Sequence, residues 1–304
     1  IYFKIYLRQS IPTQQLQYIF TCIMLTRFIA TILFICALFG HFDGEKFAGN
    51  SAQAVIGDLL SAINRGEGKD KLDKATDDRP AVKILFIGNS YTFYNDLPKL
   101  LESIAVSHKS APYKIYSEQV TVGGATIKKH WEQKNAINKI TNNQWNYVIL
   151  QDQSTVMLHR KWARNSEIYI KKFVDLIRNN GNAGVILYAT WPRRAGHEIY
   201  QNKKTPKGHN YNYMKKQVDQ QYLKIARDNN VNILITSDIW GAAQQNNINV
   251  YQADGSHPTL YGSYLVALKL YKVLFPQEIL NIDEIFIPRK LDKQKINLIL
   301  QMMQ

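Results

Sequence analysis

From residue 81 onward, short apolar runs alternate with longer segments in which apolar residues recur every three or four positions. Runs of four to eight apolar residues between turn formers are typical of buried strands, and the longer period is typical of helices. Their alternation predicts βα units around a parallel sheet. We expect strands at 82–87, 113–118, 147–150, 185–190 and 231–236, and helices at 97–107, 165–178, 211–228 and 261–274. The predicted fold class is α/β: a three-layer α/β/α sandwich with a five-stranded, mostly parallel sheet.

The composition changes along the chain in a way that predicts its organisation. Residues 62–80 are rich in charged residues and turn formers and have no apolar period, which is typical of a solvated linker. We therefore expect a polar linker over 41–80, one α/β domain over 81–276, and a C-terminal helical extension over 277–304. A chain of 304 residues accommodates one such domain with extensions.

The N-terminal part contains an uncharged apolar run, 28–39, which follows Arg27 and the candidate initiator Met24. This pattern is typical of a signal peptide. If residues 1–23 are translated, the stretch 18–39 is broken only by Arg27 and is long enough to span a bilayer. Residues 1–40 are thus expected to be a signal peptide or an N-terminal membrane anchor. The expected location is secreted, periplasmic or membrane-anchored on the extracytoplasmic side.

The composition also argues against several classes of function. The formal net charge of +14 invites nucleic-acid binding, but the basic residues are scattered and no zinc-finger spacing occurs, so we expect no nucleic-acid partner. Both cysteines, Cys22 and Cys36, precede the predicted domain, which therefore has no disulfide or thiolate nucleophile. Neither a metal motif of the His-Glu-x-x-His type nor a Gly-rich phosphate loop is present, so we expect no metal and no cofactor.

A serine follows the first predicted strand directly, in the sequence Ile84-Leu-Phe-Ile-Gly-Asn-Ser-Tyr-Thr92. A turn at this point exposes the hydroxyl of Ser90 at the edge of the sheet, and the start of the next helix offers backbone N–H groups to an oxyanion. Taken alone, a serine after a strand is more often a cap or a turn residue.

A second candidate group, Asp254-Gly-Ser-His257-Pro, precedes the last predicted helix of the domain. A nucleophilic serine needs a base to accept its proton, and the base needs a carboxylate that orients it. Asp254 and His257 are close enough on one loop to supply both groups. By itself, Asp-x-x-His is more often a capped turn.

Four blocks in a fixed order make a stronger signal than either group alone. The strand with Gly-Asn-Ser90 is followed by Val122-Gly-Gly-Ala125, then by Gln151-Asp-Gln-Ser154 after a buried strand, and then by Asp254-x-x-His257. This order resembles that of the SGNH/GDSL hydrolase family, and the resemblance covers roughly residues 81–275. It implies a serine hydrolase with the α/β/α fold described above, in which the five-stranded, mostly parallel sheet is flavodoxin-like.

The resemblance also implies roles for individual residues. Ser90 would be the nucleophile and an oxyanion-hole donor, with His257 as base and Asp254 as its orienting acid. Gly124 would complete the hole through its N–H, with Gly123 as the alternative register. The third block departs from the family's Gly-x-Asn-Asp; here the side-chain amide of Gln153, or in reserve Gln151, would take the place of the asparagine.

The expected activity is hydrolysis of a carboxylic ester, with an O-acyl group on a carbohydrate as the favoured substrate. Trp191 is a candidate substrate-binding residue, because it ends the fourth predicted strand on the side of the presumed site. Tyr91 is a second candidate, and both it and Tyr94 flank the nucleophile and are expected to help shape the entrance. The alternatives are a lipid esterase of the lysophospholipase type and a non-catalytic carbohydrate-binding relative with the same fold. The intact set of Ser90, His257 and Asp254 argues against the non-catalytic alternative, and the unusual third block favours it.

Overall fold

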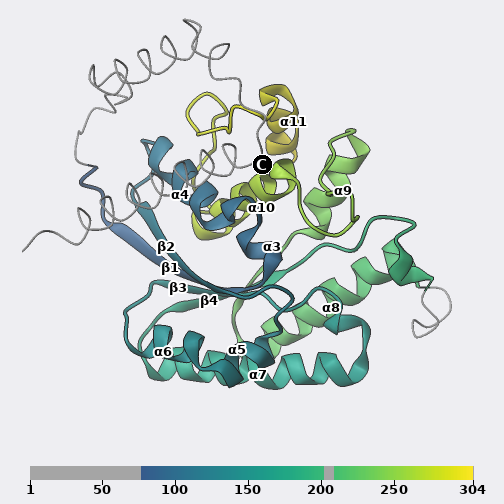
Figure 1. Cartoon of the computed structure of the whole chain (residues 1–304). Coiled ribbons are helices and arrows are strands. Elements are labelled where there is room, and N and C mark those ends of the chain that lie inside the picture. Colours follow the sequence, from purple (N-terminus) through teal and green to yellow (C-terminus); the bar gives the residue numbers. More distant parts are fainter. Residues whose placement is uncertain (1–76, 202–208, 304) are drawn as a thin grey trace, which may run out of the picture. The chain divides into compact units, whose positions relative to one another are not determined.

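The computed structural model describes residues 77–201 and 209–303 (Figure 1). The expected signal peptide or anchor, 1–40, and nearly all of the expected linker lie outside these described residues. None of the helices in the described ranges is both long enough and apolar enough to cross a membrane.

The centre of the fold is a sheet of five strands in the order β2-β1-β3-β4-β5. All four neighbouring pairs of strands are parallel. This order is that of the flavodoxin-like doubly wound sheets, so the predicted fold class is confirmed. The strands are β1 (Ala81–Gly88), β2 (Lys114–Thr121), β3 (Tyr147–Leu150), β4 (Gly184–Ala189) and β5 (Asn232–Ile235).

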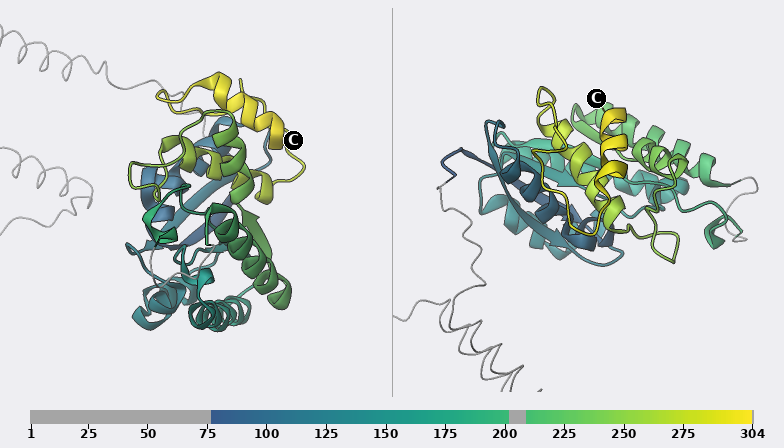
Figure 2. Two further views of the ribbon diagram at one scale, coloured as in Figure 1. Left: turned by 90° about the vertical axis from the view of Figure 1, so that its right-hand side faces the viewer. Right: turned by 90° about the horizontal axis from the view of Figure 1, so that it is seen from above.

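Helices cover both faces of the sheet, as Figure 1 and the rotated views in Figure 2 show. One layer contains α4 (Leu97–Ser107), α9 (Ser237–Gln245), α10 (Leu260–Leu274) and α11 (Lys293–Met303), and the short α3 (Ser90–Phe93) lies on the same side. The other layer contains α5 (Ile127–Gln133), α6 (Asn135–Thr141), α7 (Arg160–Asn179) and α8 (Tyr211–Asn229). The short helices α3, α5, α6 and α9 were not expected from the sequence.

The central strand β1 shows why the sheet is buried on both faces. Ile84 and Phe86 belong to the core shared with α4 and α10, while Leu85 and Ile87 belong to the core shared with α7 and α8. Successive side chains of a strand point to opposite faces, so a nearly continuous apolar run fills two cores at once.

The last described residues pack on the same body as the rest. Ile296, Ile299 and Leu300 of α11 are buried in the core that contains α4 and α10. The helix expected in the C-terminal extension is therefore present, and its apolar side chains are continuous with the core of the α/β domain.

The parallel register brings the ends of three strands together. Gly88 at the end of β1 is paired with Thr121 of β2, and its neighbour Ile87 is paired with Leu150 of β3. The chain leaves these strands toward Ser90, Gly124 and Gln153, which are far apart in the sequence. In doubly wound folds ligands bind at this edge of the sheet.

Candidate active site

Ser90 is the first residue of α3 and follows β1 after a sharp turn at Asn89. The Asn89 side chain accepts a hydrogen bond from the backbone N–H of Tyr91 (3.1 Å) and donates one to the carbonyl of Ala125 (3.0 Å). It thereby caps the helix and ties it to the loop after β2. Gly88 is required by close approach, because a Cβ there would lie 2.6 Å from the side chains of Gln151 and Thr92. Contacts with Ala125, Gln151 and Thr92 therefore fix the turn that presents Ser90.

The loop between α9 and α10 carries the second half of the site. His257 and Asp254 lie on this loop, which is closed by a hydrogen bond from the N–H of Gln252 to the carbonyl of His257 (2.8 Å). Gly255, between them, has a φ of +64°, which residues with a side chain rarely adopt. The tight turn brings the two side chains together.

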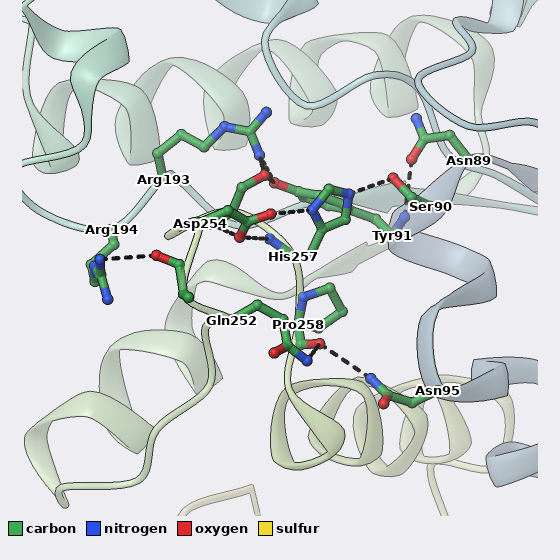
Figure 3. A network of polar contacts seen from close by, with 12 residues as sticks. Asn89, Ser90, Tyr91, Asn95, Arg193, Arg194, Gln252, Asp254, His257 and Pro258 are labelled. Atoms are coloured by element: carbon green, nitrogen blue, oxygen red, sulfur yellow. Dashed lines mark hydrogen bonds and ion pairs between the residues drawn. The ribbon is translucent and has the colours of Figure 1, made fainter. Parts of the chain in front are cut away.

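Ser90, His257 and Asp254 form a continuous row of hydrogen bonds (Figure 3). Nε2 of His257 lies 2.9 Å from Oγ of Ser90, and Nδ1 lies 2.5 Å from Oδ2 of Asp254. The other carboxylate oxygen, Oδ1, accepts from the N–H groups of Ser256 (2.9 Å) and His257 (3.0 Å). With Nδ1–H donating to the carboxylate, Nε2 is free to accept the serine proton.

The electrostatics of Asp254 suit an orienting carboxylate. Partial burial raises the pKa of this carboxyl, but the hydrogen bonds from the His257 side chain and from two backbone N–H groups outweigh burial and lower the pKa to about 2. Asp254 is therefore ionised at neutral pH, as an imidazolium partner requires.

Arg193 lies beside this row. Its guanidinium donates hydrogen bonds to the hydroxyl groups of Tyr91 and Ser256, and it lies over the Tyr91 ring. Burial lowers its pKa, and within 77–201 and 209–303 it forms no salt bridge. It joins the end of β4 to the loop that carries His257.

Three donors near Ser90 have no acceptor among the described residues: the backbone N–H groups of Ser90 and Gly124 and the side-chain amide of Gln153. Gly124 has a φ of +64°, and a Cβ there would meet nothing within 4 Å, so its backbone borders open space. Oε1 of Gln153 accepts from the N–H (2.8 Å) and the hydroxyl (2.7 Å) of Thr155. These two bonds fix the orientation of the amide and leave its NH₂ group as the free end.

Gln151, the reserve candidate, has a different environment. It is fully buried; its Oε1 accepts from the N–H of Asn89 and from the hydroxyl of Thr92 (both 2.9 Å), and its Nε2 donates to the carbonyl of Asp152. All its polar groups are engaged in holding the end of β1 against the end of β3. Of the two glutamines, only Gln153 has a side-chain NH₂ group without an acceptor among the described residues, and only Gln153 borders a cavity.

The structure contradicts the expectation that Trp191 and Tyr91 contact substrate. Trp191 is 0% exposed and lies between the rings of Tyr91 (4.4 Å between centroids) and Trp240 (3.7 Å). Tyr91 is buried as well, and its hydroxyl is 2.9 Å from Oγ of Ser256. Both residues support the site from within the core.

Two further residues lie close to the site: Tyr94, which was expected near its entrance because it flanks Ser90, and His130, which the sequence did not single out as a site residue. The ring of Tyr94 stacks on the imidazole of His257. His130 is buried, and its Nε2 donates to the carbonyl of Gly88 (2.7 Å), which supports the strand end before Ser90. Burial lowers the pKa of His130, so the ring is neutral at pH 7. Neither contact has a signal in the local sequence.

A cavity of about 440 Å³ lies beside Gly124 and Gln153, between α5 and the start of α7. Asp152, which borders it, is buried and accepts hydrogen bonds from the N–H groups of Ile127 (3.0 Å) and Gln153 (2.7 Å) and from the hydroxyl of Ser166 (2.5 Å). Burial raises the pKa of Asp152. Within the described part of the chain, no group of three or more histidine, cysteine, aspartate or glutamate side chains could hold a metal ion.

A flavodoxin-like sheet with a serine after β1 and an Asp-x-x-His loop before α10 is the arrangement of the SGNH/GDSL hydrolases, and the chain has this fold. A solved structure from Slackia heliotrinireducens, described as a candidate SGNH hydrolase, is 24% identical to the chain and superimposes with a TM-score of 0.52 over 64% of this chain and 99% of that one. A DUF4886 family protein from Bacteroides uniformis is 16% identical, with a TM-score of 0.61 over 73% of this chain and 93% of that one. The sequence matches no protein-family model and no curated protein.

Proposed function

We propose that the protein is an exported serine esterase that hydrolyses a carboxylic ester, and that the ester is an O-acyl group on a carbohydrate. The observation that carries this proposal is the row of hydrogen bonds from Asp254 through His257 to Ser90, next to three donors without an acceptor among the described residues. A nucleophile, an oriented base and an oxyanion hole are the parts that acyl transfer needs.

In the proposed reaction, Nε2 of His257 takes the proton of Ser90 as Oγ attacks the ester carbonyl. The oxyanion of the tetrahedral intermediate accepts hydrogen bonds from the N–H groups of Ser90 and Gly124 and from the amide of Gln153. His257 then gives its proton to the leaving alcohol, and an acyl-enzyme remains. Water, deprotonated by His257, attacks this ester and releases the acid and free Ser90. No cofactor takes part.

Two alternative functions compete with this proposal. A lipid esterase would use the same three residues, and would differ in its preference for long acyl chains. A non-catalytic carbohydrate-binding relative would keep the fold without turnover. The hydrogen bond between His257 and Ser90, at 2.9 Å, favours a catalytic protein over a relative that only binds.

The proposed nucleophile is tested by labelling the purified full chain with a fluorophosphonate probe and locating the added mass. We expect the probe on Ser90, and no labelling of the Ser90→Ala variant, because only an activated serine attacks the phosphorus. Hydrolysis of a short-chain aryl ester should fall by about 10³-fold or more in the same variant. A folded Ser90→Ala protein with wild-type turnover would refute the proposal.

Export is proposed from the sequence of the N-terminal part, where Arg27 precedes the apolar run 28–39. When the chain is expressed in a bacterial host from Met24, we expect it in the extracytoplasmic or membrane fraction. Fractionation followed by detection of a C-terminal tag measures this. Full-length protein found only in the cytosol would contradict export and leave the proposed chemistry unaffected.

A further inference from the structure

The cavity beside Gly124 and Gln153 lies in the helical layer opposite the one that His257 contacts. His257 contacts Tyr91, which belongs to the core shared with α4 and α10. The cavity is formed by α5 and α7, whose apolar residues belong to the core on the other face of the sheet. Figure 1 shows these two helical layers above and below the strands. Ser90 stands at the edge of the sheet between them.

This placement determines which part of an ester each side receives. The tetrahedral carbon attached to Oγ of Ser90 carries the oxyanion, the leaving oxygen and the acyl substituent. The leaving oxygen has to face His257, because Nε2 of His257 delivers its proton. The oxyanion has to face the donors of Gly124 and Gln153. The acyl substituent takes the remaining direction, and the cavity is open space next to the reacting carbon because Gly124 and Gln153 line it as well.

We propose that this cavity is the acyl pocket of the esterase and that it takes a hydroxylated aromatic acyl group of the hydroxycinnamoyl or hydroxybenzoyl kind. The inference rests on the proposed ester hydrolysis and names the class of acyl group that the site accepts. Cavities of this size, about 440 Å³, fall in the range of small-molecule binding sites. An acetyl group would leave most of the space empty.

The side chains around the cavity favour an aromatic group over an alkyl chain. The indole of Trp162, at the start of α7, borders the cavity and is 48% exposed. It is held on one side by the ring of His159, with centroids 4.3 Å apart. An exposed indole offers a planar surface for stacking with another ring. Most of the surface that lines the cavity is apolar, and Trp162 is the one aromatic side chain among the lining residues, so a flat ring has a stacking partner there that an alkyl chain does not use.

A polar group next to the indole fits a ring hydroxyl. Asn165 borders the cavity one turn of helix after Trp162. Its side-chain amide has no hydrogen-bond partner in the described part of the chain, so it can donate to a phenolic oxygen or accept from it.

The test compares three methyl esters on the full chain, so that the leaving alcohol is constant: the acetate, the octanoate and the 4-hydroxycinnamate. We expect kcat/KM for the 4-hydroxycinnamate to exceed that for the acetate by about tenfold or more. In Trp162→Ala this value should fall by about tenfold, and the value for the acetate should stay within about twofold. Ile168→Ala is the matched control, because Ile168 is also exposed on α7 (43%) and does not border the cavity.

Three results would overturn the acyl-pocket proposal: a preference for the octanoate, an equal loss on acetate and 4-hydroxycinnamate in Trp162→Ala, or no loss at all. Each of them leaves the proposed function intact if the acetate is hydrolysed and Ser90 is labelled by the fluorophosphonate. Failure of labelling together with no turnover of any ester would instead overturn the proposed function, and the acyl pocket with it.

Discussion

The phenol ring of Tyr94 lies nearly parallel to the imidazole of His257, with ring centroids 4.4 Å apart and planes 17° apart. Tyr94 begins a short 3₁₀ turn, Tyr94–Asp96, between α3 and α4. The next residue, Asn95, has a positive φ of 54°, and its amide donates to the carbonyl of Pro258 (3.2 Å) and to Oγ of Ser263 (2.9 Å). These two hydrogen bonds attach the turn to Pro258, just before α10, and to Ser263, in the first turn of α10. The imidazole of His257 is therefore positioned by stacking with Tyr94 as well as by its own two hydrogen bonds.

Tyr94→Leu is expected to lower kcat by about 2- to 5-fold, because His257 becomes positively charged in the transition state and a π face stabilises a cation by about 0.5–1 kcal/mol at a partly exposed position. Tyr94→Phe keeps the π face and should keep kcat. Steady-state kinetics on an aryl acetate measures both. Equal losses in the Leu and Phe variants would assign the effect to the hydroxyl instead. Tyr113→Leu serves as the control, because Tyr113 is exposed and directly precedes β2, at the end of the strand away from Thr121.

Gln153→Ala should reduce kcat by about 10²- to 10³-fold with little change in KM, because the amide would act mainly on the oxyanion of the transition state. Gln151→Ala should behave differently. It leaves the N–H of Asn89 and the hydroxyl of Thr92 without their acceptor, so we expect a loss of about 1–3 kcal/mol in the free energy of unfolding.

Kinetics and urea unfolding on both glutamine variants separate the two roles. Near-normal kcat in a folded Gln153→Ala protein would mean that the oxyanion hole consists of backbone N–H groups alone. If Gln151→Ala instead lowered kcat strongly with little change in the free energy of unfolding, Gln151 and not Gln153 would be the oxyanion-hole donor.

The sequence could predict the fold because the signal for it is local. Each strand of the sheet is a short apolar run, and the alternation with amphipathic helices determines the class. The sequence could also predict the nucleophile and the Asp-x-x-His loop, since Ser90 is adjacent to a strand and Asp254 and His257 share one turn. The distance of 2.9 Å between Nε2 of His257 and Oγ of Ser90 depends in addition on how the loop between α9 and α10 packs against the residues that follow β1.

The choice between Gln151 and Gln153 was not accessible from the sequence. Residues two apart at a strand end point to the same side, and what distinguishes them is which amide is satisfied by partners elsewhere. Gln151 is satisfied by Asn89 and Thr92, about sixty residues earlier in the chain. Such a contact exists only after the strands have paired.

Trp191 and Trp162 illustrate the same limit for aromatic residues. Trp191 follows β4 at the correct edge of the sheet, but Trp240 of α9 covers it, and α9 was not expected. Trp162 lies in the first turn of α7, which begins at Arg160, whereas the apolar period predicts a helix from residue 165. The exposed indole therefore fell outside the predicted element.

Trp191→Ala is expected to lower the free energy of unfolding by about 3–5 kcal/mol, because removal of a fully buried indole leaves a cavity between Tyr91 and Trp240. The KM of an acetate ester should remain near the wild-type value in the folded fraction, since Trp191 has no exposed surface. Urea unfolding and steady-state kinetics measure the two effects. A raised KM with unchanged stability would restore Trp191 as a substrate contact.

Asp254→Asn tests the orienting carboxylate through its pH dependence. The folded-state pKa of Asp254, about 2, is below the ordinary value of 3.8, so the carboxylate's contribution to stability is fully present above about pH 4 and is lost as the pH falls through about 2. The amide of asparagine does not titrate. The wild type should therefore be more stable than the variant at pH 6, and the difference should shrink between pH 4 and pH 2.

The size of this difference is limited by solvent. The Asp254 side chain is 47% exposed, so water screens its pair with His257, and we expect no more than about 1 kcal/mol between the two proteins at pH 6. The effect on kcat at neutral pH should be far larger, about 10²- to 10⁴-fold, because asparagine neither fixes the Nδ1–H tautomer nor stabilises the imidazolium. Urea midpoints at pH 6, 4, 3 and 2, with kcat at pH 7, test both statements. A stability difference that is independent of pH would show that Asp254 does not hold the lowered pKa, and a kcat within about twofold of wild type would remove it from the catalytic row.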